Sequence, residues 1–171
     1  MMQTRHTEID SPLGELTLAA NGDALTGLYF PHHRHAPTAH VLGRYVEPAA
    51  DVLFGHAAEQ LHEYLTGERT LFDLPIGLTG QPRQRRVWDL LPDIGYGETT
   101  TYGELAAELA DGTGAYEVGQ AVGRNPLSII VPCHRVVGKN GALTGYAGGL
   151  KRKRILLDLE APVPAAAGRL F

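Results

Sequence analysis

Hydrophobic and polar residues alternate in the first part of the chain and then change to a helical spacing. Alternation is typical of strands, because successive side chains of a strand point to opposite faces of a sheet. It predicts strands over Thr4–Asp10, Glu15–Ala20 and Ala24–Phe30. Apolar residues at four-residue spacing then predict a helix over Asp51–Leu65, which Gly67 can end. Strands followed by a helix favour an α/β domain.

The segments around this helix carry weaker patterns. Residues 31–48 contain prolines and a histidine cluster, and we expect a loop there. Residues 72–76 match a strand that returns to the sheet. The run 77–82 contains two glycines and ends in a proline, which indicates a linker. We therefore place one domain at residues 1–80 and a second at residues 81–171.

The second half is dominated by patterns of short helices. A helix is predicted over Arg83–Leu91, where Pro92 ends the pattern. Thr101, followed three residues later by Glu104, matches a capping box that opens another helix. A further helix over residues 115–122 follows a turn with two glycines. Two short helices joined in this way are typical of a helix-turn-helix motif.

An apolar run and a hairpin pattern follow the helix-turn-helix. Leu127–Val131 and Val136–Val137 read as strands on either side of Cys133. The Asn-Gly pair at residues 140–141, followed by Leu143–Thr144, predicts a β-hairpin. A helix-turn-helix with a hairpin wing is a winged-helix arrangement. The predicted fold class is therefore α/β (α+β), with a winged-helix domain in the second half.

Composition places the chain among globular proteins of one large or two small domains. It has 171 residues, 43% hydrophobic and 20% charged, and no apolar run approaches the roughly 18 residues of a membrane span. One cysteine excludes an internal disulfide and a cysteine-rich zinc site, and a free thiol suits the reducing cytoplasm. We expect a cytoplasmic protein that is monomeric in the free state.

Charge is distributed unevenly, although the net charge is only −4. Residues 1–80 contain four Lys/Arg and ten Asp/Glu, whereas residues 81–171 contain eleven and nine. The second half is therefore the one expected to meet a polyanion. Chance asymmetry between two domains is the alternative.

The strongest candidate for chemistry is the thiol of Cys133, which stands beside His134 in the segment Val131-Pro132-Cys133-His134-Arg135-Val136. A thiol attacks as the thiolate, and a nearby base or cation favours that form. An isolated cysteine would instead be interpreted as a small buried hydrophobic residue. The flanking sequence decides between the two interpretations.

This flank, from Arg124-Asn125-Pro126 through Cys133 to Gly145-Tyr146-Ala147-Gly148-Gly149, resembles the O(6)-alkylguanine-DNA alkyltransferases, also called methylated-DNA–protein-cysteine methyltransferases. The resemblance runs from about Gln84 to Glu160 and more weakly through the N-terminal part. It implies a ribonuclease-H-like α/β domain before the winged helix, with no cofactor or metal. It also implies repair of double-stranded DNA by base flipping and a single irreversible transfer to Cys133 from O(6)-alkylguanine, or alternatively O(4)-alkylthymine.

The resemblance further implies roles for individual residues. Cys133 would accept the alkyl group, His134 would deprotonate it through a water, and Glu160 would orient His134. The supporting residues would be an asparagine that holds a turn, a tyrosine that helps to rotate the nucleotide and a lysine near the leaving oxygen: Asn125, Tyr102 and Lys153.

A second group is expected to contact DNA or the base: Tyr116, Gln120, Arg124, Arg135, Tyr146 and Gly148. The chain departs from the family's pattern here. Tyr116 stands where the family has an arginine that enters the base stack, and Glu117 replaces a small residue. Ala147 stands where many members have serine. Because an aromatic ring can stack on bases, we predict that Tyr116 fills the vacated stack.

Other classes of protein fit parts of this pattern. A cysteine hydrolase would need a histidine from elsewhere in the fold and an oxyanion hole. A simple winged-helix binder would not need Cys133. An alkyltransferase-like damage sensor would bind without reacting, although such relatives lack the cysteine. His32, His33 and His35 could bind a metal, but we favour an exposed loop.

Overall fold

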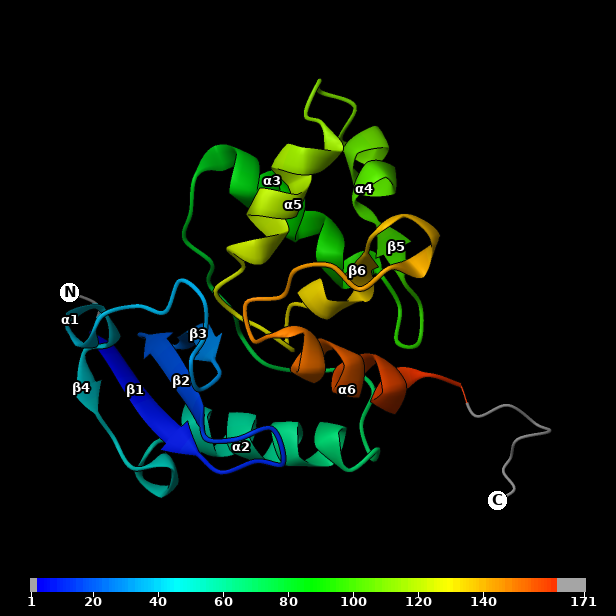
Figure 1. The fold of residues 1–171 in the computed structure, drawn as a ribbon. Coiled ribbons are helices and arrows are strands. Elements are labelled where there is room, and N and C mark those ends of the chain that lie inside the picture. Colours follow the sequence, from blue (N-terminus) through cyan, green and yellow to red (C-terminus); the bar gives the residue numbers. More distant parts are fainter. Residues whose placement is uncertain (1–2, 163–171) are drawn as a thin grey trace, which may run out of the picture.

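Four strands form the N-terminal sheet of the computed structural model, which describes residues 3–162 (Figure 1). β1 (Thr4–Ile9), β2 (Leu16–Asn21) and β3 (Ala24–Tyr29) follow the predicted alternation, and β4 (Arg44–Tyr45) lies at the edge. The strand order is β3-β2-β1-β4. β2 pairs antiparallel with both β1 and β3, whereas β4 runs parallel to β1.

Helix α2 (Val52–Leu65) packs against this sheet, as the apolar spacing predicts. The Asp51 carboxylate caps it by accepting a hydrogen bond from the Phe54 backbone N–H at 3.1 Å, and it also pairs with Arg5 of β1. Gly67 follows the helix with a φ of 84°. The buried side chains of α2 are Phe54, Ala57, Leu61 and Tyr64.

Two N-terminal predictions are wrong. Residues 31–48 are more ordered than a loop, because α1 (Ala39–Leu42) and β4 lie within them and the 3-10 helix η1 (Pro48–Ala50) begins at their last residue. Elements this short contain too few residues to show a hydrophobic period. Residues 72–76 do not form a strand, and only Ile76 makes an isolated bridge to β3.

The second half contains the predicted helix-turn-helix. The Thr101 hydroxyl accepts a hydrogen bond from the Glu104 N–H at 3.1 Å, and the Glu104 carboxylate accepts one from the Thr101 N–H at 3.2 Å. The predicted capping box is therefore confirmed. The elements are α3 (Pro82–Leu90), η2 (Leu91–Asp93), α4 (Tyr102–Leu109) and α5 (Ala115–Gly123).

The predicted winged-helix class is consistent with the structure, but the residues of its wing do not form the expected two-stranded β-hairpin. β6 (Val136–Val137) pairs in parallel with β5 (Thr100–Thr101), which directly precedes α4. The chain then turns through η4 (Lys139–Gly141), where Asn140 has a φ of 61°. Asn140 and Gly141 thus form a turn, as their residue types predict. No second strand follows, because two of the next main-chain carbonyls accept hydrogen bonds from the Lys153 side chain instead.

The apolar run Leu127–Val131 is not a strand either. It forms a tight turn in which the Val131 N–H donates to the Leu127 carbonyl at 3.0 Å and Ile129 has a φ of 71°. Its hydrophobicity reflects burial in the core, where Leu127 bridges to Leu28 of β3. The 3-10 helix η3 (Cys133–Arg135) follows, so the cysteine lies in a helical turn.

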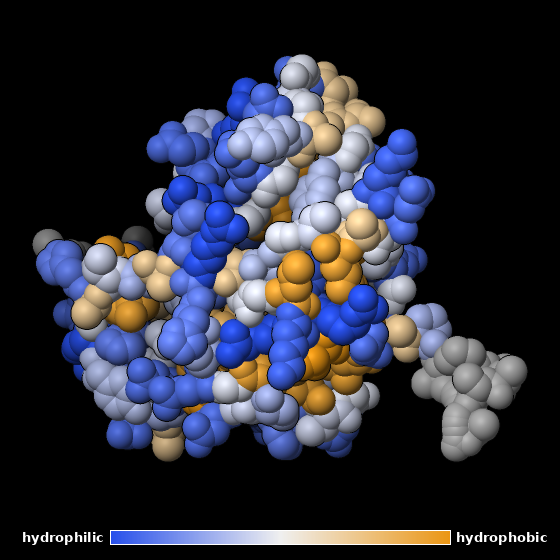
Figure 2. Space-filling model, in the orientation of Figure 1, coloured by the Kyte–Doolittle hydropathy of each residue, from blue (hydrophilic) through white to orange (hydrophobic). Residues whose placement is uncertain are grey.

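Helix α6 (Leu150–Glu160) lies between α2 and the helices of the second half (Figure 1). One buried core runs through both halves and includes Leu16 of the sheet, Trp88 of α3 and Leu156 of α6. Figure 2 shows apolar side chains gathered over α6 among charged ones. No helix within residues 3–162 combines the length and the apolar character needed to cross a membrane.

Candidate active site

Cys133 begins η3, and the residue is 4% exposed. Its backbone N–H donates to the Val131 carbonyl at 2.8 Å. Burial raises the pKa of the Cys133 thiol above its ordinary value. Three polar neighbours, Asn125, Lys153 and Ser128, counteract this rise only in part. The resting thiol therefore keeps its proton at neutral pH and needs a base before it can attack.

The imidazole of His134 is completely buried, and its Nε2 lies 2.8 Å from Oε2 of Glu160. Because that carboxylate is ionised, Nε2 carries the proton and donates it, which leaves Nδ1 as an acceptor. Nδ1 has no hydrogen-bond partner within the described part of the chain. Burial lowers the pKa of His134 and outweighs the opposing effect of Glu160. The imidazole therefore rests neutral and can accept a proton.

Glu160, the last residue of α6, collects hydrogen bonds from three side chains. Its Oε1 accepts from Nε of Arg135 at 2.8 Å, and its Oε2 accepts from Nη2 of Arg135 at 2.9 Å. The hydroxyl of Tyr64, on α2, also donates to Oε2. Burial alone would raise the pKa of Glu160, but the hydrogen bonds from His134 and Arg135 outweigh it and lower the pKa to about 2.

Arg135 is buried against Glu160 and does not line the groove beside the site, in contrast to the DNA contact expected from the sequence. Its side chain is buried, holds Glu160 through two nitrogens, and donates from Nη1 to the Ile94 carbonyl at 2.6 Å. A guanidinium binds carboxylates and phosphates with the same planar geometry, so its residue type alone could not distinguish the two partners.

Asn125 holds the turn that carries the cysteine segment. Its Nδ2 donates to the Val131 carbonyl at 2.9 Å, and its Oδ1 accepts from the Leu127 N–H at 3.1 Å. Both ends of the turn are thus tied to the buried side chain of Asn125, and the turn ends two residues before Cys133. This is the geometry that the expected supporting role requires.

Lys153, in the first turn of α6, ties the segment after β6 to the helix. Its Nζ donates to the carbonyls of Val136, Thr144 and Gly145 at 2.6, 3.0 and 3.2 Å. Burial lowers the pKa of Lys153 to about 8. The Tyr102 hydroxyl donates to the Thr144 carbonyl at 3.0 Å, and the Tyr102 ring centre lies 5.9 Å from Nζ. Both side chains therefore already have acceptors for their protons.

Three buried polar atoms around the thiol have no hydrogen-bond partner within residues 3–162: Ser128 Oγ, His134 Nδ1 and the Tyr146 hydroxyl. Burial holds the pKa of Tyr146 well above its ordinary value, so the hydroxyl remains a donor. The Ser128 hydroxyl is close enough to lower the pKa of both Cys133 and Tyr146. Unpaired buried polar groups are costly, so these atoms are available to hydrogen-bond a substrate or a water.

Sequence reasoning missed Ser128 and Tyr64. A hydroxyl inside the apolar run 127–131 was the only signal for Ser128. Tyr64 stands at a core position of α2, and nothing local in the sequence links it to Glu160.

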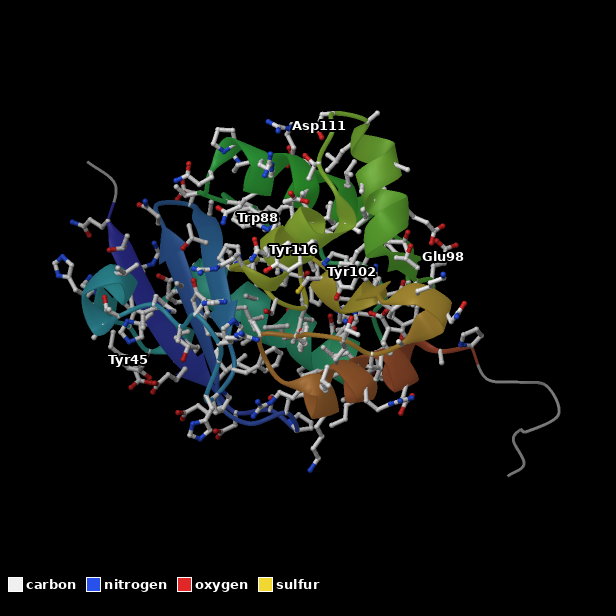
Figure 3. All side chains as sticks on the ribbon, turned by 45° about the horizontal axis from the view of Figure 1, so that its top comes forward. Tyr45, Trp88, Glu98, Tyr102, Asp111 and Tyr116 are labelled. Atoms are coloured by element: carbon white, nitrogen blue, oxygen red, sulfur yellow. The ribbon has the colours of Figure 1, made fainter. Side chains whose placement is uncertain are left out.

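An open groove of about 880 Å³ borders the site. Figure 3 shows Tyr102 and Tyr116 on the same side of the helical part. Tyr116 is 75% exposed, and its hydroxyl accepts a hydrogen bond from Nε2 of Gln120 at 3.0 Å. The N-terminal half contributes Arg34 and His35 to the wall. The predicted contact residues in the groove are Tyr116, Gln120, Arg124 and Tyr146.

Two other predictions are corrected by their surroundings. Gly148 is buried and does not line the groove, and a Cβ there would lie 2.3 Å from the Phe30 ring, so this glycine permits close packing. His33 is buried rather than exposed, accepts from the Phe30 N–H at 3.2 Å, and has its pKa lowered to about 4 chiefly by burial. Among the described residues, no group of three or more His, Cys, Asp or Glu side chains could hold a metal ion.

Comparison with known protein sequences gives matches along almost the whole chain. The ribonuclease-like domain of 6-O-methylguanine DNA methyltransferase matches residues 4–78, and its DNA binding domain matches residues 82–162. A methylated-DNA–protein-cysteine methyltransferase of Mycobacterium tuberculosis is 48% identical over 164 residues, which cover 95% of this chain and 96% of that protein. The constitutive enzyme of that name from Bacillus subtilis is 40% identical over 156 residues, or 91% and 94%.

Solved structures give the same result. Mycobacterium tuberculosis OGT in complex with DNA superposes with a TM-score of 0.80 and 45% identity, over 92% of this chain and 95% of that chain. An O6-methylguanine DNA methyltransferase from Methanococcus jannaschii superposes with a TM-score of 0.64 and 27% identity, over 96% and 99%. The predicted fold class is confirmed, with a ribonuclease-like part followed by a DNA-binding part.

Proposed function

The chain belongs to the 6-O-methylguanine DNA methyltransferase family, and on this premise we propose that it repairs DNA by moving an alkyl group from O6 of guanine to Cys133. It is then a methylated-DNA–protein-cysteine S-methyltransferase that acts once, because the thioether product is not hydrolysed. One observation carries the proposal. The free Nδ1 of His134 is buried at the residue next to the thiol, with Nε2 bound to Glu160.

His134 supplies the base for this reaction. Nδ1 takes the thiol proton through one bridging water, and the charge that forms on the imidazole is stabilised by Glu160. Sγ of Cys133 then forms a bond to the alkyl carbon while the bond from that carbon to O6 breaks. The electron pair of the broken bond leaves with guanine as an anion. The proton that the thiol gave to His134 balances the one that guanine takes up through water, so His134 returns to its neutral form.

We assign Tyr146 as the hydrogen-bond donor to the departing guanine. The family resemblance places Lys153 near the leaving oxygen, and Tyr102 is a second candidate donor, but the protons of both are directed at main-chain carbonyls. The Tyr146 hydroxyl keeps its proton and is not directed at a main-chain carbonyl; its polar neighbour is the Ser128 hydroxyl. Lys153 instead supports the site by holding the adjoining loop, and below its pKa of about 8 its charge favours the thiolate.

The alkylated base must leave the helical stack, since Sγ is too deeply buried to reach into a duplex. Base flipping into the groove is therefore part of the proposal, with the exposed ring of Tyr116 stacking where the base was. Three arginines line the groove, Arg34, Arg83 and Arg124, and Glu117 opposes them. Because only a few phosphates can be neutralised there, binding to undamaged duplex is weak and modestly salt-dependent. We place the protein in the cytoplasm because its thiol must stay reduced.

The test counts repaired guanines against protein chains. An oligonucleotide duplex with O6-methylguanine is incubated with limiting protein, and restored guanine is measured until repair stops. One repaired base per chain supports the proposal, whereas continued repair would indicate the turnover of a hydrolase. The Cys133→Ser variant should bind the same duplex and restore no guanine. Repair by that variant would exclude Cys133 as the acceptor.

A further inference from the structure

Tyr64 connects the N-terminal half directly to the carboxylate of the candidate active site. This tyrosine is completely buried near the end of α2 and lies 96 positions from Glu160 in the sequence. Its hydroxyl donates to Oε2 of Glu160, the same oxygen that accepts from Nε2 of His134. A residue of the ribonuclease-like half thus shares an acceptor atom with the base.

The position of this hydroxyl has an electrostatic consequence. Oε2 carries part of the negative charge that would stabilise a protonated His134, and a second donor on the same atom withdraws some of that charge. Burial raises the pKa of Tyr64, and Glu160 adds to the rise, so the hydroxyl remains a donor at any physiological pH. The effect on His134 is therefore permanent in the folded protein.

We propose that Tyr64 is a positioning residue for alkyl transfer: its hydroxyl fixes Oε2 of Glu160 toward His134 and weakens the pull of that carboxylate, so that His134 rests neutral and ready to accept the thiol proton. The inference rests on the proposed function, because it assigns His134 the role of base. It gives the ribonuclease-like half a part in the chemistry besides its part in the fold.

Several other titratable groups surround this pair, and all of them stay in place when only the Tyr64 hydroxyl is removed. Arg135 faces it from η3, where Cys133 directly precedes His134, and Lys153 faces it from α6. Tyr96 and Tyr146 face Glu160 from the loops before β5 and after η4. Their fields are common to wild type and variant, so a change in the titration of His134 reports the Tyr64 hydroxyl.

The test compares Tyr64→Phe with Tyr96→Phe. Both changes delete a tyrosine hydroxyl and keep the ring, and the two rings lie 6.2 Å apart. The Tyr96 hydroxyl donates to the Leu159 carbonyl at 3.3 Å instead of to the carboxylate of Glu160. His134 is titrated by NMR in each protein, with its signals assigned by their loss in His134→Gln. Single-turnover methyl transfer is measured across the same pH range.

In Tyr64→Phe, the titration of His134 should move to higher pH, and the acid limb of the transfer rate should move with it. The rate should fall several-fold on the acid limb and approach that of the wild type on the plateau. Tyr96→Phe should match the wild type in both. An unmoved titration of His134, or a rate lowered equally at every pH, would overturn the proposal, because a purely structural role predicts that pattern.

The two proposals fail in different ways. If the wild type transfers no methyl group but His134 shifts in Tyr64→Phe, the proposed function is wrong and the electrostatic role of Tyr64 stands. If the wild type transfers normally and His134 does not shift, only the role of Tyr64 is wrong. The same Tyr64→Phe change on a Glu160→Gln background tests whether the shift in His134 is transmitted through the Glu160 carboxylate. There, Tyr64→Phe should not move the titration of His134 further, and a shift of the original size would contradict the mechanism.

Discussion

Replacing Glu160 by glutamine tests how far the buried carboxylate stabilises the fold. Glutamine keeps the volume of the side chain but leaves the buried Arg135 guanidinium without a counter-ion. Burial alone would raise the pKa of Glu160, yet its hydrogen bonds lower it from 4.5 to about 2. At roughly 1.4 kcal/mol per pKa unit, this corresponds to about 3 kcal/mol of folding stability. Breaking a buried ion pair costs about 3–5 kcal/mol in general, so the two magnitudes agree.

The pH dependence of this loss has a definite sign. Because the pKa of Glu160 is lower in the folded chain than in the unfolded chain, its contribution is complete at neutral pH and is lost as the pH falls through 4.5 toward about 2. Urea unfolding at pH 7 should show Glu160→Gln to be less stable than the wild type by about 3 kcal/mol. At about pH 3.5 the difference should be roughly 1.5 kcal/mol smaller.

The matched control is Glu63→Gln on α2. Glu63 pairs with Arg69 at 2.8 Å, but both side chains are partly exposed, at 35% and 29%. Such a pair contributes at most about 1 kcal/mol. If the two variants lose equal stability at pH 7, or if the deficit of Glu160→Gln stays constant between pH 7 and about pH 3.5, the reasoning about the buried carboxylate is refuted.

Three further predictions concern residues around the thiol and the groove. Asn125→Ala should lower the free energy of unfolding in urea by about 1–3 kcal/mol, because it leaves the buried Leu127 N–H unpaired and removes one of two donors to the Val131 carbonyl; a loss under about 0.5 kcal/mol would contradict this. The methyl-transfer rate of the wild type should decline as the pH rises through about 8, because buried Lys153 then loses its proton. Lys153→Met should react more slowly and show no such decline. Tyr116→Ala should slow repair in duplex DNA and leave reaction with free O6-methylguanine unchanged, whereas Tyr116→Phe should keep duplex repair; equal rates for Ala and wild type on duplex would show that Tyr116 does not fill the stack.

Features that depend on neighbouring residues could be predicted from the sequence. The four-residue apolar spacing of α2 and the Thr101–Glu104 capping box are local, and both are present. The same holds for Asn125, whose turn-forming role needs only residues up to position 131. The motif around Cys133 marked the site for the same reason.

Features that depend on distant partners could not be predicted. The apolar run at residues 127–131 resembles a strand because burial by the sheet and by the helices imposes the same composition. Arg135 looked available to phosphate because its partner, Glu160, is 25 positions away. Tyr64 reaches the same carboxylate from 96 positions away, so its contact exists only once the two halves have packed together.

The central claim is that Cys133 is the sole acceptor of the alkyl group. Its most direct test is the intact mass of the protein after incubation with a duplex containing O6-methylguanine, followed by peptide mapping, with an undamaged duplex as control. The account predicts one added methyl group per chain, found on the peptide that contains Cys133, and no change with the control duplex. An unchanged mass in a protein that still binds the damaged duplex, or a methyl group on any other residue, would contradict the account.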